Sequence, residues 1–156
     1  MKIREATVND IPQMVFLSEE KRTTYEIYQP VFWRKASNSA EVQATYFENL
    51  LLEGNHISIV CENEQEFTGF LFGAVISAPP VYDPGGKSCL IDDFCISASA
   101  QWQNEGNALL EYCRKKAALL GAVQFVIVCG QEDEAKRAFL SGSNLSVASE
   151  WYTGSI

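Results

Sequence analysis

Apolar and polar positions in the first half of the chain follow the spacing of a strand, two helices and a hairpin. Residues Lys2–Ala6 alternate as in a strand, and Thr7-Val-Asn-Asp10 then opens a helix with an N-cap hydroxyl and an acid three positions later. Helical spacing predicts a second amphipathic helix over 40–53. Two β-rich runs, 56–62 and 66–78, are separated by a polar turn and predict a hairpin.

The second half alternates between strand and helix patterns. It opens with a stretch rich in Pro and Gly, which favours a loop, and its long helical run is closed by Gly121. The predicted elements are a loop over 79–86, a strand over 88–97, a helix over about 104–120, a buried strand over 125–129, a short helix over 132–140 and a last strand over 145–152.

This order predicts an α/β fold of the mixed α+β type in one domain, residues 1–156. The central strands would be antiparallel, one strand–helix–strand crossover would follow, and helices would cover both faces of the sheet. In such sheets a ligand binds where a strand ends and a helix begins. Here that place is the junction after Ser97.

Composition narrows the classes of partner. Twelve basic against twenty acidic residues give a net charge of −8, which disfavours nucleic acid. No apolar run is long enough to cross a membrane, and the charged start lacks the apolar core of a secretion signal, so we expect a cytoplasmic protein with no membrane partner. Five cysteines without a CxxC pair and a single histidine predict no metal site.

The junction after Ser97 is suited to an anion. A loop of small and amide residues leads into the helix, whose first N–H groups are free and carry the positive end of the helix dipole. Such an end holds a diphosphate without a basic side chain. An acidic protein can therefore still bind an anionic ligand here.

This junction resembles the signature of the GNAT superfamily of N-acetyltransferases, Q/R-x-x-G-x-G/A. The residues Gln101-Trp-Gln-Asn-Glu-Gly106 match it, with Ile96 in the place of a strand Val five residues earlier and Leu109-Leu110 after it. A register beginning at Gln103 breaks both flanking distances. The resemblance extends over essentially the whole chain.

The resemblance implies a GNAT-like acyl-CoA N-acyltransferase fold that binds acetyl-coenzyme A (acetyl-CoA) as cosubstrate between the fourth and fifth strands. The pantetheine would lie along the fourth strand, and the pyrophosphate over the start of the helix. The residues it assigns to the cofactor are Phe94, Cys95, Ile96, Gln101, Trp102, Gln103, Asn104, Glu105, Gly106, Asn107, Ala135 and Phe139.

The chain departs from the family pattern in two places. Asn104 replaces the first signature glycine, and we expect it to tolerate a left-handed backbone, while Glu105 would place a negative charge near the phosphates. Phe139 stands where many members carry a tyrosine that protonates the leaving thiolate. Tyr152 or Tyr82 are then the candidate donors, unless the thiolate leaves unaided.

The acceptor side is predicted from an acidic pair. Asp92 and Asp93 interrupt an apolar strand, and a buried carboxylate is costly without a partner or a role. We interpret Asp92 as the base or as the anchor of the acceptor amine. Asp93 would then assist Asp92, or would hydrogen-bond the backbone at a bulge. The alternative without a functional role is that one of the two acids faces solvent on the other side of the strand. Aromatic residues predicted to wall the acceptor site are Tyr28, Trp33 and Tyr82, although such clusters are also typical of a core.

The sequence thus predicts an N-acetyltransferase acting on an amine of a small molecule by direct attack in a ternary complex. One alternative is a catalytically impaired acyl-CoA-binding sensor or partner domain, and another is a protein or peptide N-acetyltransferase. The resemblance also allows a homodimer.

Overall fold

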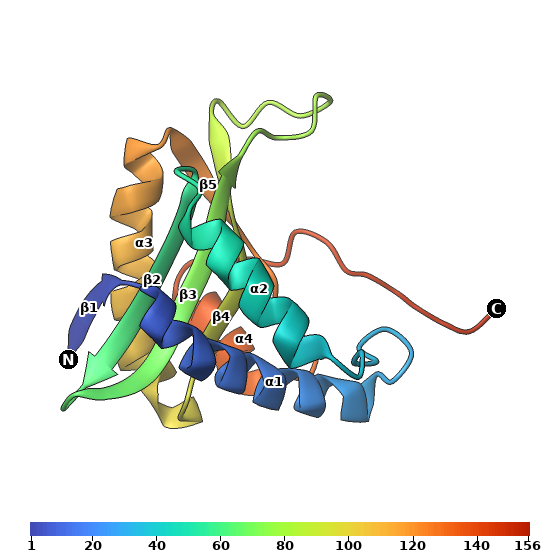
Figure 1. Ribbon diagram of the computed structural model, residues 1–156. Coiled ribbons are helices and arrows are strands. Elements are labelled where there is room, and N and C mark those ends of the chain that lie inside the picture. The colour runs from blue at the N-terminus through green and yellow to red at the C-terminus, as the bar shows by residue number, and fades with distance from the viewer.

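A computed structural model of residues 1–156 shows a single five-stranded sheet whose strands follow in chain order (Figure 1). The first four strands are antiparallel, and the fifth runs parallel to the fourth. The strands are β1 (Lys2–Glu5), β2 (His56–Asn63), β3 (Glu66–Ile76), β4 (Lys87–Ile96) and β5 (Ala122–Ile127). The predicted mixed, mostly antiparallel sheet is confirmed.

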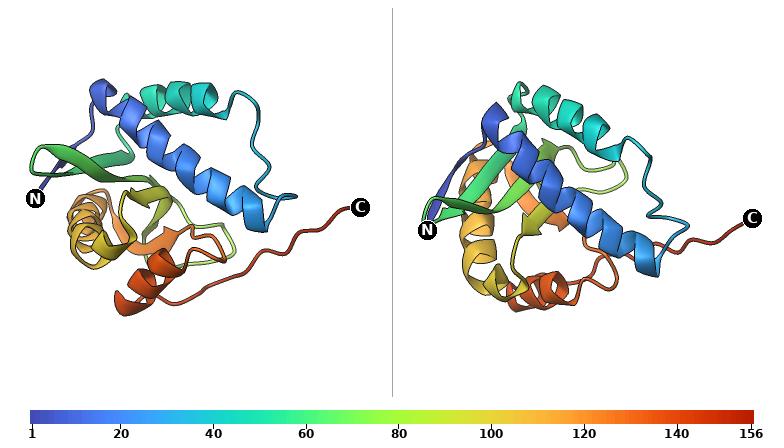
Figure 2. Two further views of the ribbon diagram at one scale, coloured as in Figure 1. Left: turned by 90° about the horizontal axis from the view of Figure 1, so that it is seen from below. Right: turned by 60° about the horizontal axis from the view of Figure 1, so that its bottom comes forward.

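Two helices cover each face of the sheet, as Figure 2 shows from below. Helices α1 (Ile11–Tyr28) and α2 (Ser39–Leu51) lie on one face, and α3 (Asn107–Leu119) and α4 (Glu134–Gly142) on the other. None of these helices combines the length and the apolar content that crossing a membrane requires.

Alternating side chains of β3 fill two separate cores. Phe70 and Phe72 pack against Phe47 of α2, with ring centroids 5.8 and 5.7 Å apart. Leu71 points the other way, into the core that α3 covers with Leu110 and its neighbours. Because both faces are buried, the strand reads as a continuous apolar run rather than an alternating one.

The first strand is tied to the sheet and to α1 by one arginine. The Arg4 guanidinium donates to both carboxylate oxygens of Asp10, at 2.8 and 2.7 Å, and its Nε donates to Glu62 of β2 at 2.8 Å. The Asp10 carboxylate also accepts from the backbone and hydroxyl of Thr7 in a capping box. The predicted helix start is therefore confirmed, and it is also an electrostatic junction between three elements.

The predicted last strand is wrong. Residues 145–152 form no strand but an extended tail that leaves the body of the protein (Figure 1). Leu145 still packs on the α3 core, whereas Val147 and Trp151 are exposed. The intervening residues Ala148–Glu150 are small or polar, so the segment lacks the apolar face that would hold it against β5.

The predicted strand over 125–129 is also misplaced. Strand β5 begins at Ala122 and forms an edge of the sheet, so Val123 and Val126 are exposed rather than buried. The sequence pattern cannot distinguish a buried strand from an apolar edge strand, because both are short valine-rich runs.

The substitution Asp10→Asn should lower the free energy of unfolding by about 2 kcal/mol, because a nearly buried carboxylate loses its charged bonds to Arg4. Thermal unfolding followed by circular dichroism measures the loss. The exposed Glu20 of α1, as Glu20→Gln, is the matched control and should change little.

Acid should erase this difference. Hydrogen bonds from Arg4 lower the pKa of Asp10 below its ordinary value of 3.8, although burial acts in the opposite direction. The stabilisation is therefore complete above that ordinary value and is lost as the pH falls through the lower folded-state pKa. A D10N deficit that persists unchanged at pH about 2 would show that the charge is not its cause.

Candidate active site

Strands β4 and β5 separate before β4 ends. They pair in parallel as far as Ile91 and Ile127, and the amide of Val128 donates to the Ile91 carbonyl at 3.0 Å. Strand β4 then continues to Ile96, whereas the chain after β5 turns into α4. We call the space between the diverging strands the β4–β5 opening. It is where the sequence predicts the cofactor.

A lysine amine crosses this opening. Lys136 of α4 is fully buried, and its Nζ donates to the carbonyl of Phe94 on β4 at 3.2 Å and to that of Val128 after β5 at 2.8 Å. Sequence analysis missed this residue. The available signal was its helical spacing, because Lys136 shares the buried face of α4 with Phe139 and Leu140, three and four residues later.

The two adjacent acids lie at a β-bulge in β4. Phe72 pairs with Asp93 and Gly73 pairs with Ile91, so Asp92 is the extra residue opposite β3. The bulge shifts the alternation of side chains along β4 by one residue. As a result, Asp93 faces α1 and α2, and Asp92 is exposed beside it.

Asp93 is held by neutral donors from both helices. The Ser18 hydroxyl of α1 donates to its Oδ1 at 3.3 Å, and the Gln43 amide of α2 donates to its Oδ2 at 3.2 Å. The oxygen of the Gln43 amide accepts from Arg22, which also contacts Glu19 at 3.2 Å. This side chain is therefore fixed in place, as a positioning group needs to be.

Asp92 has the properties of a better proton acceptor than an ordinary aspartate. Partial desolvation raises its pKa first, and repulsion by Asp93 raises it further, while the more distant Lys21 and Lys136 lower it. A raised pKa brings a carboxylate closer to the working pH and makes it a stronger base. Burial raises the pKa of Tyr46 on α2, and the negative charges of Asp92 and Asp93 raise it further.

The helix start after β4 differs from the expectation in its backbone. Residues Ser99–Gln101 form a 3-10 turn and Trp102–Gly106 a π turn that leads into α3. Asn104 lies inside this helical path, so the expectation of a left-handed backbone there is wrong; the non-glycine residues with positive φ lie elsewhere.

Glu105 corrects a second expectation. The π turn directs its side chain inward, where it is only 1% exposed, and its Oε2 has no hydrogen-bond partner. Burial raises the pKa of the Cys61 thiol in β2, and the nearby Glu105 raises it further. A charge expected at the phosphate site therefore lies in the core instead.

The other residues that the resemblance assigns to the cofactor divide between surface and interior. Cys95 is buried against α1 and α2, Ile96 and Ala135 are half-buried against the α3 core, and Gln101 is half-buried. The side chains exposed at the helix start are those of Gln103, Asn104 and Asn107.

Three aromatic rings close the core beneath the opening. Trp102 lies 4.9 Å from Phe94 and 5.3 Å from Phe139, measured between centroids, and Phe139 is fully buried. A Cβ on Gly106 would approach the Trp102 ring at 3.0 Å, so glycine lets the helix start pack against this cluster. Phe139 thus serves as core packing in the place of the family tyrosine.

The aromatic residues predicted for the acceptor side gather where α1 ends. Trp33 packs on Tyr25 with centroids 5.1 Å apart, and Tyr28 lies against the same ring at 5.7 Å. The Tyr25 hydroxyl donates to Asp133 at 2.6 Å and accepts from the Gly130 amide at 3.1 Å. A Cβ on Gly130 would lie 2.5 Å from Tyr25, so only glycine fits between the tyrosines.

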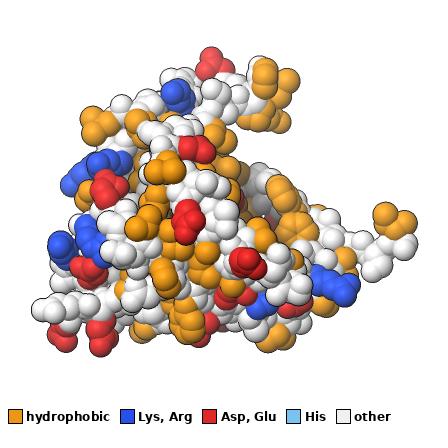
Figure 3. All heavy atoms as spheres, in the orientation of Figure 1, with side chains coloured by type: hydrophobic (Ala, Val, Ile, Leu, Met, Phe, Trp, Pro, Cys, Tyr) orange, Lys and Arg blue, Asp and Glu red, His pale blue; other side chains and the backbone are white.

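The two remaining tyrosine candidates are far more exposed. Tyr82 is 71% exposed in the loop between β3 and β4. Tyr152 is 88% exposed in the extended tail, where its hydroxyl donates to Glu150 at 2.8 Å. The structure does not bring Tyr152 to the opening, because the predicted strand over 145–152 that would have carried it there does not form. Figure 3 shows the surface hollowed below the protruding loop, between α2 and the tail.

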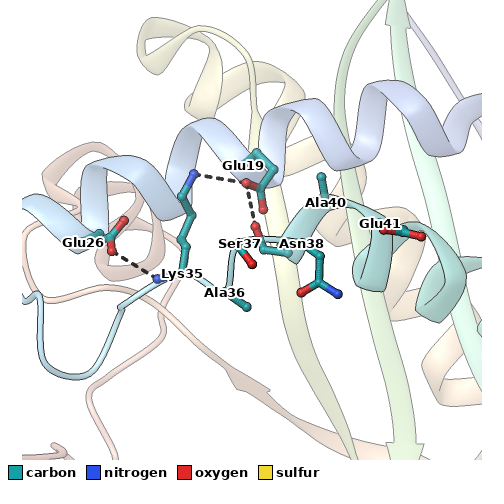
Figure 4. Close-up of a pocket in the computed structure, with 9 residues that line it drawn as sticks. Glu19, Glu26, Lys35, Ala36, Ser37, Asn38, Ala40 and Glu41 are labelled. Atoms are coloured by element: carbon teal, nitrogen blue, oxygen red, sulfur yellow. Dashed lines mark hydrogen bonds and ion pairs between the residues drawn. The ribbon is translucent and has the colours of Figure 1, made fainter.

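A pocket of about 590 Å³ lies beside α1, at the segment that leads into α2 (Figure 4). The Glu19 carboxylate in it accepts from Lys35 at 3.1 Å and from Ser39 at 2.9 Å. Neither Asp92 nor Asp93 lines this pocket. Because the two predicted acids lie elsewhere, this pocket is not the centre of the predicted chemistry.

No protein-family model matches the chain, and no curated protein matches its sequence. Many solved structures match its fold. A mutant of the BH1408 protein from Bacillus halodurans superposes with a TM-score of 0.85 at 14% identity, over 100% of this chain and 99% of that chain.

Two further matches are named acetyltransferases. A predicted acetyltransferase from Clostridium acetobutylicum, solved with acetyl-CoA, has a TM-score of 0.76 at 15% identity and covers 99% of this chain and 95% of its own. An aminoglycoside acetyltransferase from an uncultured soil metagenomic sample, solved with sisomicin, has a TM-score of 0.65 at 18% identity, over 99% and 96%. The chain therefore shares the fold of these two proteins, a mixed and mostly antiparallel sheet with helices on both faces, as the order of its elements predicts.

Proposed function

We propose that the protein is an N-acetyltransferase that moves an acetyl group from acetyl-CoA to an amine of a small molecule. The observation that carries the proposal is the β4–β5 opening with two carboxylates, Asp92 and Asp93, at the bulge beside it. The fold likeness to acetyltransferases, one of them solved with acetyl-CoA, supports the same reaction class.

The residues around the opening fit acetyl-CoA. The Phe94 carbonyl faces the opening, where it accepts from Lys136, and the exposed amide side chains of Gln103, Asn104 and Asn107 lie along the first turns of the helical segment that follows β4. The Glu105 side chain is buried and so does not occupy the surface on which the phosphates would lie. When bound, the cofactor supplies an acetyl thioester, which is activated toward amines.

Asp92 would take the proton from the attacking amine, directly or through water, in a ternary complex without a covalent enzyme intermediate. A neutral amine is needed for attack, and general-base help of this kind contributes about 10²–10⁴ in rate. Asp93, fixed by Ser18 and Gln43, would orient the acceptor ammonium before deprotonation. Tyr28 and Trp33 would wall the acceptor site, and Tyr82 would cover it from the loop.

Two alternatives remain distinguishable by assay. A sensor or partner domain that binds acyl-CoA without transfer is favoured by Phe139, a core residue with no proton to give. It predicts cofactor binding but no thiol release with any amine. A peptide N-acetyltransferase predicts transfer to free peptide N-termini and none to small amines.

Association and location stay predictions. A homodimer is expected from the resemblance, and multi-angle light scattering decides it. We expect the protein to act in the cytoplasm.

Isothermal titration with acetyl-CoA should give micromolar binding. Asn104→Asp adds one negative charge beside the phosphates. At about 8 Å in water each charge pair costs roughly 0.5 kcal/mol, so two pairs weaken binding about fivefold. The matched control is Gln13→Glu, an amide-to-acid change on exposed α1. No binding of acetyl-CoA by the unmodified protein up to millimolar concentration would exclude the cofactor site.

The substitution Asp92→Asn should lower turnover about 100-fold or more with the best amine of a panel, while acetyl-CoA affinity changes less than about twofold. The matched control is Asp83→Asn in the exposed loop, where an amide oxygen can still accept from Gly85. In the unmodified protein, activity should rise with pH through a carboxylate pKa above 3.8, because only the ionised base works. Wild-type turnover in D92N would remove Asp92 as the base.

A further inference from the structure

The side chain of Lys136 is fully buried. It lies between two carbonyls of diverging strands, and the rings of Phe94 and Trp102 lie 5.5 and 5.9 Å from it. It forms no ion pair, although a lysine is almost never fully buried without one. Two carbonyl acceptors leave one further ammonium proton without a partner of opposite charge.

Charged and titratable groups approach this amine from three sides. Lys21 comes from α1, Asp92 and Cys95 from β4, and Cys129 and Asp133 from the segment between β5 and α4. Of the two carboxylates near the amine, Asp133 is already engaged by Tyr25, and Asp92 is exposed at the bulge.

The environment favours loss of a proton from Lys136. Burial lowers the pKa of its amine to about 7, and the positive charge of Lys21 adds to the effect. Burial also opposes the charge on Lys21, but the neighbouring Cys95 and Asp93 of β4 help to raise the pKa of Lys21 above its ordinary value. The two amines therefore share charge unequally, and the one inside the opening is the more ready to give a proton.

We propose that Lys136 is the proton donor to the sulfur of coenzyme A as the acetyl group leaves. This inference rests on the proposed function, because it needs the thioester in the β4–β5 opening. Its geometric basis is that the Lys136 amine is the titratable group that spans this opening from strand to strand. Phe139 has no proton to give, and the two tyrosines predicted as donors are largely exposed, Tyr152 in the tail and Tyr82 in the loop between β3 and β4.

The step balances in atoms and charge. The bond from the acceptor nitrogen to the acetyl carbon forms, and the bond from that carbon to sulfur breaks with its electron pair moving to sulfur. A proton passes from the Lys136 ammonium to the sulfur. The proton that the acceptor nitrogen loses to Asp92 returns to Lys136 through water and Lys21.

The direction of this transfer follows from the two acidities. An ordinary thiol has a pKa of about 8.5, and burial lowers the pKa of the Lys136 ammonium to about 7, so transfer of the proton to sulfur is downhill. Tyr25 cannot compete, because burial and its bond to Asp133 raise the pKa of its hydroxyl far above neutral.

Two substitutions separate chemistry from packing. Lys136→Gln keeps N–H donors for the two carbonyls but has no titratable proton, and Lys136→Met keeps only the volume. Both should lower kcat about 100-fold or more, and the fall of kcat at alkaline pH that a proton donor imposes should disappear. The exposed Lys115→Met on α3 is the matched control. If K136Q retains wild-type kcat and the same alkaline limb, Lys136 is only a structural clamp and the inference is wrong.

A second readout does not depend on turnover. With carbon-13 in the lysine ε position, the Lys136 resonance, identified by its loss in K136Q, should titrate near neutral pH. Saturating coenzyme A should shift this titration, and desulfo-coenzyme A, which lacks the sulfur, should not. Equal shifts with both ligands would overturn the inference, as would an acetyl group found on Lys136 by mass spectrometry, since the lysine would then be the acceptor.

These outcomes differ from a failure of the proposed function. If the function is wrong, the unmodified protein fails to bind acetyl-CoA or to release thiol with any amine. If only the inference is wrong, the unmodified protein binds and reacts, and the Lys136 variants do so equally well.

Discussion

The candidate site depends on the point where β4 parts from β5 and on the lysine that spans the gap. Parallel strands that stop pairing leave carbonyl and amide groups without partners, which is costly inside a protein. Here the Lys136 amine donates hydrogen bonds to the carbonyls of Phe94 and Val128 and so supplies the missing partners. Helix α4 is thereby attached to both strands at the place where the sheet opens, so the same contact that keeps the fold closed also supplies the site with a titratable group.

A chain of polar contacts fixes the other wall of the site. It runs from Asp93 on β4 through Gln43 of α2 to Arg22 and Glu19 of α1, and ends at Lys35 and Ser39. The side chains of Gln43, Arg22 and Glu19 each make contacts with two other members of the chain. The positions of α1 and α2 over β4 are therefore coupled to the orientation of a single carboxylate.

The sequence was sufficient for the order of the elements and for the junction after β4, because strand and helix periods and the signature residues are local. It was not sufficient where tertiary packing decides. Asn104 and Glu105 belong to a π turn whose form depends on packing against Trp102, and no propensity predicts it. Lys136 reads as an ordinary surface lysine until α4 is placed on the sheet. The residues beyond Leu145 resemble a strand in sequence, but they lack an apolar face that could pack against the sheet.

The bulge at Asp92 has a consequence for the length of β4. Before it, Cys89 and Ile91 face the α3 side, and after it the even-numbered Phe94 does. The same residues in a regular strand without the bulge would exchange Phe94 and Cys95 between the two cores, placing a ring where a thiol fits and a thiol where a ring is needed. The bulge therefore lets β4 carry one residue more than its partner while the side chains on both sides of Asp92 keep their cores. Deleting Asp92 would leave a regular strand with Phe94 and Cys95 still in their own cores, whereas removing a residue between Phe94 and the end of β4 would shift every later side chain to the opposite face.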